Sequence, residues 1–189
     1  HLTLYTFSTE NWGRPKSEVS ALMTLLLKTI SIEVKELHKK NVRFTTIGDL
    51  SMLPESTQKG ILDGIEMTKS NSGLNLCLAL NYGSRQEMVS AVQSIAERVK
   101  IGELDSTEIN ETIFSQALST ANMSDPDLLI RTSGECRLSN FLLWQSAYTE
   151  IYMTETYWPA FREESLLNAI LDYQLRERRF GKVSEQVKP

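Results

Sequence analysis

Two arginines and a hydroxyl follow an apolar run near residue 130, and this segment could bind an anion. Residues 128–130 are apolar, and Arg131, Arg137 and Ser139 follow them around a Ser-Gly turn. Guanidinium groups present paired N–H donors that match phosphate oxygens, and turn N–H groups with a hydroxyl can complete a cradle. The spacing therefore predicts an anion site, with a diphosphate as the expected ligand. Arginines after a strand also pair with surface carboxylates, and that alternative stays open.

A carboxylate, Glu150, stands at the start of the next short apolar run. If the two predicted strands align, Glu150 faces the arginine turn, and a carboxylate beside a diphosphate suits Mg²⁺, which prefers oxygen ligands. Such a site uses one or two carboxylates together with substrate phosphates and water, so we expect a second carboxylate elsewhere. An ordinary carboxylate at a strand edge is the alternative.

Polar side chains also follow the first predicted strand. They are Ser8, Thr9, Glu10, Asn11, Trp12 and Arg14. Ser, Thr and Asn commonly cap helices, and Trp12 could pack in the core. Pro15 and Ser17 are already placed to begin the next helix, so Asn11 is not needed as its cap. An amide can orient a substrate through its donor and acceptor groups, although it is a poor general base.

Hydrophobic periodicity alternates between strand and helix along the chain. Strands are predicted at 2–7, 42–47, 74–80, 128–130 and 151–154, and helices at 17–40, 54–70, 84–100, 110–118 and 159–178. The alternation predicts one α/β domain over residues 1–189, with a mainly parallel central sheet flanked by helices. In such sheets ligands bind beyond the carboxyl ends of the strands, and polar residues follow four of the predicted strands there. They are residues 8–14, Gly48 and Asp49, Asn81, Tyr82, Gly83 and Arg85, and residues 131–139.

The helix predicted at 17–40 has a broader apolar face than a simple core stripe needs. Either the whole face is buried against the sheet, or part of it lines a hydrophobic tunnel. The first residue, His1, is followed at once by a hydrophobic strand, so we expect the chain to be N-terminally incomplete.

Composition narrows the class of protein. The chain has 20 basic and 24 acidic side chains, a net charge of −4, which argues against general affinity for nucleic acid. Cys77 and Cys136 lie in no metal-type or redox-type spacing, which fits a reducing cytoplasm. No apolar run approaches the roughly 20 residues that span a bilayer, so membrane contact is expected to be peripheral. The sequence matches neither G-x-x-x-x-G-K-[ST] nor G-x-G-x-x-G, which disfavours ATPase and dinucleotide-binding functions.

The sequence resembles the cis-prenyltransferases, and among them the bacterial undecaprenyl diphosphate synthases. The resembling segments are Phe7 to Pro15, Leu80 to Arg85, Asp127 to Gln145, Glu150, Trp158-Pro159 and Arg178 to Gly181. The resemblance implies an enzyme that condenses isopentenyl diphosphate onto an allylic diphosphate, normally farnesyl diphosphate, with cis double bonds. Its product would be undecaprenyl diphosphate, a lipid-carrier precursor for cell-wall synthesis. The resemblance also implies a hydrophobic tunnel between sheet and helices for the growing chain.

Roles for particular residues follow from the resemblance alone. The isopentenyl diphosphate is held at Arg131, Arg137, Leu138 and Ser139, and Mg²⁺ is bound by Glu150 with an aspartate upstream. Asn11 is assigned to proton removal or substrate placement, and Ser8, Thr9, Glu10, Trp12 and Arg14 line the substrate site. The Arg179-Phe180-Gly181 segment resembles a C-terminal motif that reaches across a homodimer. We expect the aromatic-rich segment from Phe141 to Tyr157 to form the dimer interface.

The sequence departs from the family pattern at two places. The family's Asp-Gly-Asn-Gly-Arg signature, which supplies the magnesium aspartate, has no match here and would precede His1. Cys136 stands where some members have a histidine, so no role is assigned to it. A non-catalytic, prenyltransferase-like partner subunit is the alternative to the enzyme. The joint presence of Asn11, Arg131, Arg137, Ser139 and Glu150 favours the enzyme, because a scaffold has no physical need for that polar set.

Overall fold

A computed structural model of the chain describes residues 1–179 and 183–186. The chain divides into two compact units, His1–Met123 and Ser124–Pro189, and each is described by itself. The elements of the first unit are β1 (Leu2–Ser8), η1 (Thr9–Gly13), α1 (Lys16–Lys39), β2 (Arg43–Ile47), η2 (Leu50–Met52), α2 (Glu55–Thr68), β3 (Asn75–Tyr82), α3 (Ser84–Lys100), η3 (Ser106–Glu108) and α4 (Glu111–Gln116). Those of the second are β4 (Leu128–Arg131), β5 (Glu150–Met153), η4 (Trp158–Ala160), α5 (Glu163–Gln174) and η5 (Ser184–Gln186).

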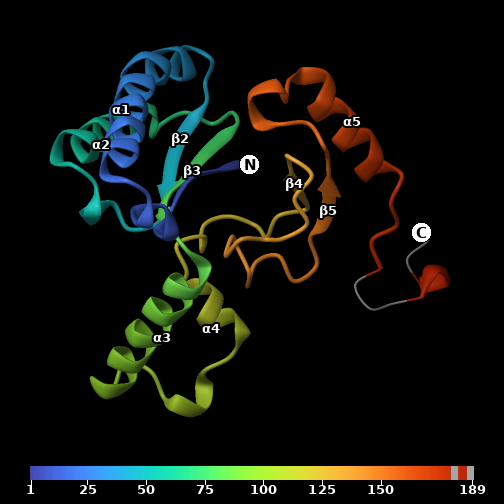
Figure 1. Cartoon of the computed structure of the whole chain (residues 1–189). Helices are drawn as coiled ribbons and strands as arrows, with labels where there is room; N and C mark the ends of the chain where they lie inside the picture. Colours follow the sequence, from blue (N-terminus) through green and yellow to red (C-terminus); the bar gives the residue numbers. More distant parts are fainter. Residues whose placement is uncertain (180–182, 187–189) are drawn as a thin grey trace. The chain divides into compact units, whose positions relative to one another are not determined.

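The first unit is built on a parallel sheet of order β1-β3-β2. Because β3 is central and all three strands run the same way, their carboxyl ends lie at one edge. The registers pair Ser8 of β1 with Tyr82, and Ile47 of β2 with Ala79. In Figure 1, α1 and α2 lie together beside these strands. The second unit contains a parallel pair, β4-β5, so every strand pairing in both sheets is parallel, as the sequence predicted.

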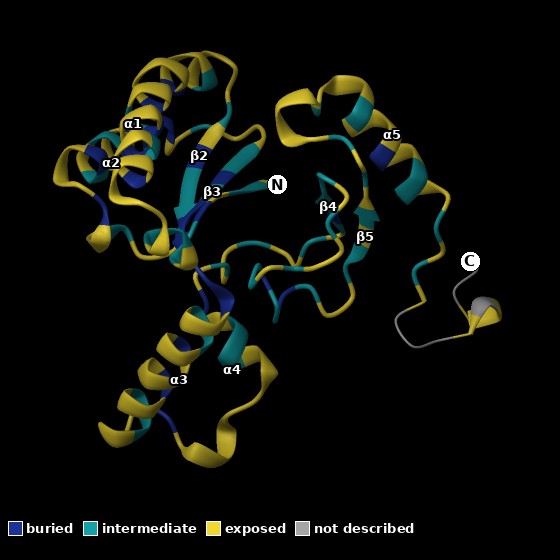
Figure 2. Ribbon diagram, viewed as in Figure 1, coloured by how far each residue is buried: buried dark blue, intermediate teal, exposed yellow. Residues whose placement is uncertain are grey.

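One stripe of α1 forms much of the core of the first unit. Its members are Val19, Met23, Leu26, Ile30 and Val34, spaced at three and four residues, and they pack with Phe7, Phe44, Leu53, Ile61 and Leu80. Burying each such side chain contributes roughly 1.5–3 kcal/mol. Leu25 and Ile32 on the same helix stay more than half exposed. Figure 2 shows this division, and the core therefore uses only part of the broad apolar face.

The end of α2 is tied to β2 by one buried hydroxyl. Thr68 Oγ1 accepts a hydrogen bond from the Phe44 backbone N–H at 3.0 Å and donates to the Gly64 carbonyl at 3.0 Å. Gly64 also allows close approach, because a Cβ there would lie 3.3 Å from the Phe44 ring. This contact fixes the start of β2 against the helix layer.

The last helix is shorter than the 159–178 that periodicity predicted. Trp158–Ala160 forms a separate 3-10 turn, and Phe161 and Arg162 are extended, so α5 begins only at Glu163. The helix ends at Gln174, and Arg176 then bonds to Asp172, Glu150 and the Ile151 carbonyl. The bonds to Glu150 and Ile151 are tertiary and replace the helical turn that the pattern favoured, whereas the bond to Asp172 spans four residues. The other helices and strands lie within a few residues of their predicted bounds, and the single domain over 1–189 stays a prediction.

Gly48 controls the turn that leaves β2. Its φ is +102°, and a Cβ there would lie 2.1 Å from the Leu80 carbonyl oxygen. We expect Gly48→Ala to lower the free energy of unfolding by about 3 kcal/mol, because strain and collision add. Gly102 is the matched control, since its φ is +78° but no atom lies within 4 Å of a Cβ there. Gly102→Ala should cost about 1 kcal/mol. Chemical denaturation measures both, and equal losses would contradict the close approach at Gly48.

Candidate functional site

The predicted site residues after β1 form a tight turn at the carboxyl end of the strand. Asn11 Oδ1 accepts a hydrogen bond from the Ser8 backbone N–H at 2.9 Å, so Asn11 does have a local capping role that the sequence analysis set aside. Its Nδ2 has no acceptor among the described residues. The amide oxygen is therefore occupied by the backbone, and the side chain offers N–H donors outward. This arrangement suits orientation of a substrate oxygen and does not suit proton removal.

Trp12 is joined to the ends of the other two strands. Its Nε1–H donates to Asn81 Oδ1 at 2.8 Å, and Asn81 Nδ2 donates to the Asp49 carbonyl at 2.8 Å. The Asp49 carboxylate accepts from the Ser51 N–H at 2.9 Å, and hydrogen bonds from Ser51 lower the pKa of that carboxyl. The Trp12 ring also meets Phe7 edge-on, with centroids 5.1 Å apart. The predicted convergence of polar groups at this edge is thus present within the first unit.

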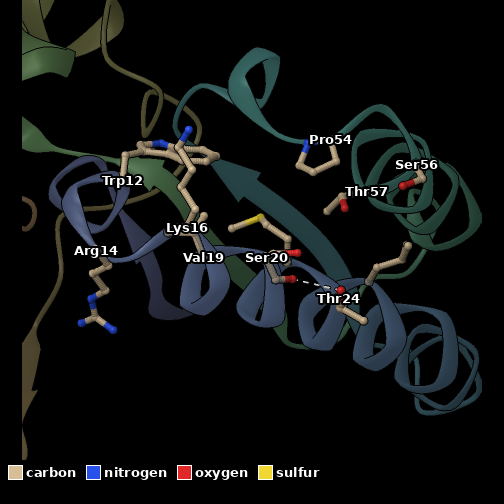
Figure 3. Close-up of a pocket in the computed structure, with 11 residues that line it drawn as sticks. Trp12, Arg14, Lys16, Val19, Ser20, Thr24, Pro54, Ser56 and Thr57 are labelled. Carbon is tan, nitrogen blue, oxygen red and sulfur yellow. Dashed lines mark hydrogen bonds between the residues drawn. The ribbon is translucent and has the colours of Figure 1, made fainter.

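A cavity of about 500 Å³ opens between the start of α1 and the start of α2. Its lining residues are Trp12, Arg14, Lys16, Val19, Ser20, Met23, Thr24, Leu27, Pro54, Ser56 and Thr57. In Figure 3, Trp12 and Arg14 lie at one end and Ser56 and Thr57 at the other. Leu27, outside the buried stripe of α1, faces this space, so the helix contributes both to the core and to a cavity wall.

The charge at the cavity comes from Arg14 and Lys16. Arg14 is paired with Glu18 at 2.8 Å, and both side chains are about half exposed, so this pair is weak. Lys16 has no ion-pair partner within the described part of the chain. The cavity thus combines cationic side chains with an apolar wall, which suits an anion that carries a hydrocarbon tail.

Only two of the predicted first-unit site residues, Trp12 and Arg14, line this cavity. Ser8 and Asn11 belong to the turn beside it, and Thr9 donates to the exposed Glu10 at 3.2 Å. The sequence alone did not point to Lys16, or to Pro54, Ser56 and Thr57 at the start of α2. These positions carry no chemical signature, and only the packing of α2 against α1 brings them to the site.

Tyr5 of β1, which is partly buried, lies next to the buried Tyr82 of β3, with ring centroids 6.2 Å apart. Tyr5 Oη donates to the Tyr82 carbonyl at 3.1 Å, and Tyr82 Oη donates to Glu87 Oε2 at 2.6 Å. Burial, with the charge of Glu10, raises the pKa of Tyr5 to about 12. Burial and the Glu87 carboxylate also raise the pKa of Tyr82. Both phenols therefore stay neutral at physiological pH and act as hydrogen-bond donors.

In the second unit, the arginine turn after β4 is held by backbone bonds to the segment after β5. The Ser133 N–H donates to the Thr156 carbonyl at 3.0 Å, and the Gly134 N–H donates to the Thr154 carbonyl at 2.9 Å. Ser133 and Gly134 have φ of +69° and +66°. A Cβ on Gly134 would lie 2.5 Å from a Glu155 carboxylate oxygen. The N–H groups of Ser133 and Gly134 are therefore engaged by the neighbouring segment and do not serve as anion donors.

The two arginines of this turn have different surroundings. Arg137 forms an ion pair with Glu135, as the surface-pairing alternative expected. Arg131 has no ion pair among the described residues, and its Nε is buried without a hydrogen-bond partner. A buried guanidinium nitrogen with no acceptor carries a desolvation cost that an anion would relieve. Ser139 is exposed with a φ of +52°, and Leu138 is partly buried beside it. Of the two arginines, Arg131 is thus the one whose guanidinium group still has an unpaired nitrogen for an anion to bind.

Cys136 lies in the same loop and is exposed as a free thiol. Its Sγ lies 3.0 Å from Met153 Sδ, which places the loop against the end of β5. No group of three or more His, Cys, Asp or Glu side chains within residues 1–179 and 183–186 could hold a metal ion.

Glu150 lies at the other end of this strand pair from Arg131. The register pairs Leu128 with Glu150, and Arg131 with Met153. The expectation that strand alignment turns Glu150 toward the arginine turn is therefore wrong. Glu150 is the first residue of β5, whereas the arginine turn follows the last residue of the parallel strand β4. Glu150 Oε2 instead accepts a hydrogen bond from Arg176 at 3.0 Å, with both side chains about 28–29% exposed. This bond raises the pKa of Arg176.

The C-terminal arginines complete the second unit. Arg178 is paired with Asp127 and also donates to Tyr173 Oη at 3.2 Å. Arg179 pairs with Glu177. Phe180 and Gly181, which belong to the segment that resembles a motif reaching across a dimer, lie outside the described residues.

The fold defines the class of protein. A solved structure of lavandulyl diphosphate synthase from Lavandula x intermedia, in complex with dimethylallyl diphosphate, matches with a TM-score of 0.94 and 40% identity. The match covers 96% of this chain and 78% of that one. A probable undecaprenyl diphosphate synthase from Campylobacter jejuni matches with a TM-score of 0.85 and 40% identity, over 96% of this chain and 83% of that one. These similarities confirm the predicted fold as that of the cis-prenyltransferases.

Sequence comparison narrows the class to a family. The family model described as "Putative undecaprenyl diphosphate synthase" matches residues 1–181. An undecaprenyl diphosphate synthase of Micrococcus luteus, described as specific for farnesyl diphosphate, is 56% identical over 96% of this chain and 73% of its own length. An isoprenyl transferase of Clostridium perfringens is 55% identical, over 96% of this chain and 72% of its own length. The chain therefore belongs to the undecaprenyl diphosphate synthase family of transferases.

The contrast between the two arginines leads to a binding test. We expect Arg131→Gln to weaken the binding of inorganic diphosphate by about tenfold, because it removes a charge-assisted donor with no competing carboxylate. Arg162→Gln is the control, since Arg162 is an exposed arginine of the same unit that donates only to the Phe161 carbonyl. Isothermal titration calorimetry measures both. Equal weakening in the two variants would remove Arg131 from the anion site.

Proposed function

We propose that this protein is a cis-prenyltransferase that condenses isopentenyl diphosphate onto farnesyl diphosphate and forms undecaprenyl diphosphate. The cavity between α1 and α2 carries the proposal, because it joins Arg14 and Lys16 to an apolar wall that includes Val19, Met23 and Leu27. An allylic diphosphate has the matching chemistry, with an anionic head and a hydrocarbon tail. The named activity of the Micrococcus luteus relative supports the same substrates.

Each group has a role in the proposed reaction. The allylic carbon–oxygen bond breaks and diphosphate leaves, the isopentenyl double bond attacks the allylic carbon, and loss of a proton leaves a new double bond. Arg14 and Lys16 bind the allylic diphosphate, while Arg131, Arg137 and Ser139 bind the isopentenyl diphosphate. The Asn11 N–H donors orient the substrate, and the departing diphosphate accepts the proton. The apolar wall excludes water from the cationic centre.

Glu150 suits Mg²⁺ as a single carboxylate ligand. The side chain is partly exposed and one oxygen is held by Arg176, so the other oxygen remains for a cation. Because the β4-β5 register separates Glu150 from the arginine turn, the proposal rests on this oxygen and not on strand alignment, with diphosphate and water as further ligands. When bound, Mg²⁺ neutralises the charge that develops on the leaving diphosphate.

We also propose a homodimer and a cytoplasmic location. Exposed aromatic side chains on both sides of β5 support an interface, since Tyr148 and Tyr157 of the predicted segment and the adjoining Trp158 are 65%, 71% and 58% exposed. Free Cys77 and Cys136 support a reducing compartment. No helix in the described part of the chain is long and apolar enough to cross a bilayer. Peripheral contact with a membrane through the lipid product is part of the proposal.

The activity itself is tested with radiolabelled isopentenyl diphosphate, farnesyl diphosphate and Mg²⁺, using the gene product that contains these 189 residues. We expect label in a long-chain, butanol-extractable product, and loss of incorporation when EDTA removes Mg²⁺. A protein that binds both diphosphates but incorporates no label would support the non-catalytic partner subunit instead.

The role of Glu150 is tested separately. We expect Glu150→Ala to lower Mg²⁺-dependent incorporation by about 100-fold, because a ligand to the charge-neutralising ion is lost. Calorimetry should also show weaker Mg²⁺-dependent binding of diphosphate, with the circular dichroism spectrum unchanged. Glu163→Ala, at the exposed start of α5, is the control. Normal incorporation by Glu150→Ala would remove the metal assignment.

A further inference from the structure

Asn81 stands out as a buried polar residue in an unusual backbone conformation. It is 6% exposed, lies near the end of the central strand β3, and has a φ of +48°. The left-handed region is unfavourable for a residue with a Cβ, although Asn tolerates it better than most. The hydrogen bonds of the Asn81 side chain offset that cost.

Both halves of the Asn81 amide are used, and each bond reaches a different strand end. Oδ1 accepts the indole N–H of Trp12, which follows β1, and Nδ2 donates to the carbonyl of Asp49, which follows β2. The backbone adds a third link, because the Asp49 N–H donates to the Asn81 carbonyl at 3.4 Å. The left-handed backbone thus places the Asn81 side chain between the residues that follow β1 and β2. No other residue type of this size supplies one donor and one acceptor in this geometry.

The bond to Asn81 fixes a ring that forms the cavity wall. Figure 3 shows Trp12 at one end of the cavity between α1 and α2. Trp12 also packs edge-on against Phe7, and this apolar contact holds the indole nitrogen in no particular direction. The hydrogen bond at 2.8 Å therefore sets the rotation of the indole plane toward the cavity.

We propose that Asn81 is a positioning residue that acts through Trp12 to set the affinity for the hydrocarbon part of the allylic substrate. This inference rests on the proposed function, since it assigns the cavity to that substrate. Asn81 does not line the cavity, so its effect on the substrate passes through the indole ring. Without the hydrogen bond from Trp12 to Asn81, the indole ring can rotate, and the cavity wall then fits the hydrocarbon part of the substrate less well.

Asn41 is a control for the amide bonding and the backbone conformation, on an exposed side chain. It too has a positive φ, +57°, and its amide also makes two bonds, to the Ser72 hydroxyl at 3.3 Å and from the Ser72 N–H at 3.0 Å. It precedes β2, whereas Asn81 lies near the end of β3, so it stands at the opposite edge of the same sheet. Asn41→Asp and Asn81→Asp are the same chemical change at the two ends.

The experiment is a double-mutant cycle on Asn81→Asp and Trp12→Phe. Asp lacks the N–H donor and sets an oxygen against the Asp49 carbonyl, whereas Phe keeps a ring against Phe7 but loses the indole N–H. We expect each change to raise KM for farnesyl diphosphate by about five- to tenfold, with little change in KM for isopentenyl diphosphate. The double variant should match Trp12→Phe alone, and Asn41→Asp should leave both constants unchanged. Additive effects, or an unchanged KM in Asn81→Asp, would overturn the proposal.

A spectroscopic measurement separates this inference from the proposed function. Asn81→Asp should shift the tryptophan emission, and the shift should vanish in the Trp12→Phe background, where Trp144 and Trp158 remain. If the unaltered protein incorporates no isopentenyl diphosphate, the proposed function fails while this shift still tests the hydrogen bond from Trp12 to Asn81. If Asn81→Asp does not fold, Trp12→Phe alone must raise KM for farnesyl diphosphate, and an unchanged KM overturns the inference.

Discussion

The parallel pairing of β3 with both β1 and β2 is the constraint on which the first unit depends. It brings the ends of three strands to one edge, where Asn81 joins Trp12 to Asp49. The turn after β1 then leads directly into α1, whose buried stripe fixes the helix on the core. The cavity wall is a by-product of that packing, because Leu27 lies off the stripe and faces the start of α2.

Charge is distributed differently in the two units. Near the cavity, Arg14 has a weak, exposed partner and Lys16 has none in the described chain, so both can meet an anion at little cost. In the second unit, Arg131 keeps a buried nitrogen without an acceptor, while Arg137 already has Glu135. An anion would thus fill an unmet bond at the first of these arginines and compete with a carboxylate at the second.

Much of the fold could be predicted from hydrophobic periodicity, because the apolar residues of β1 and β3 follow a strand pattern and those of α3 follow a helical one. The end of α5 could not, because Arg176 leaves the helical pattern for bonds to Glu150 and the Ile151 carbonyl, which are distant in sequence. Asn11 and Arg131 could be named as site candidates from the sequence because they belong to motifs, and their roles stay predictions. The site was missed at Lys16 and Thr57, which have no chemical pattern, and the facing of Glu150 was wrong because strand register is not visible in composition.

Arg176 gives the second unit a thermodynamic coupling. Its guanidinium joins Glu150, at the start of β5, to Asp172, in the last turn of α5, and to the Ile151 carbonyl. A cation that binds the other Glu150 oxygen draws on the same carboxylate charge as Arg176 and so weakens the link to α5. By reciprocity, whatever orders the chain after α5 changes the affinity of Glu150 for cations by the same factor. The carboxylate therefore reports on a helix end as well as on its own ligand.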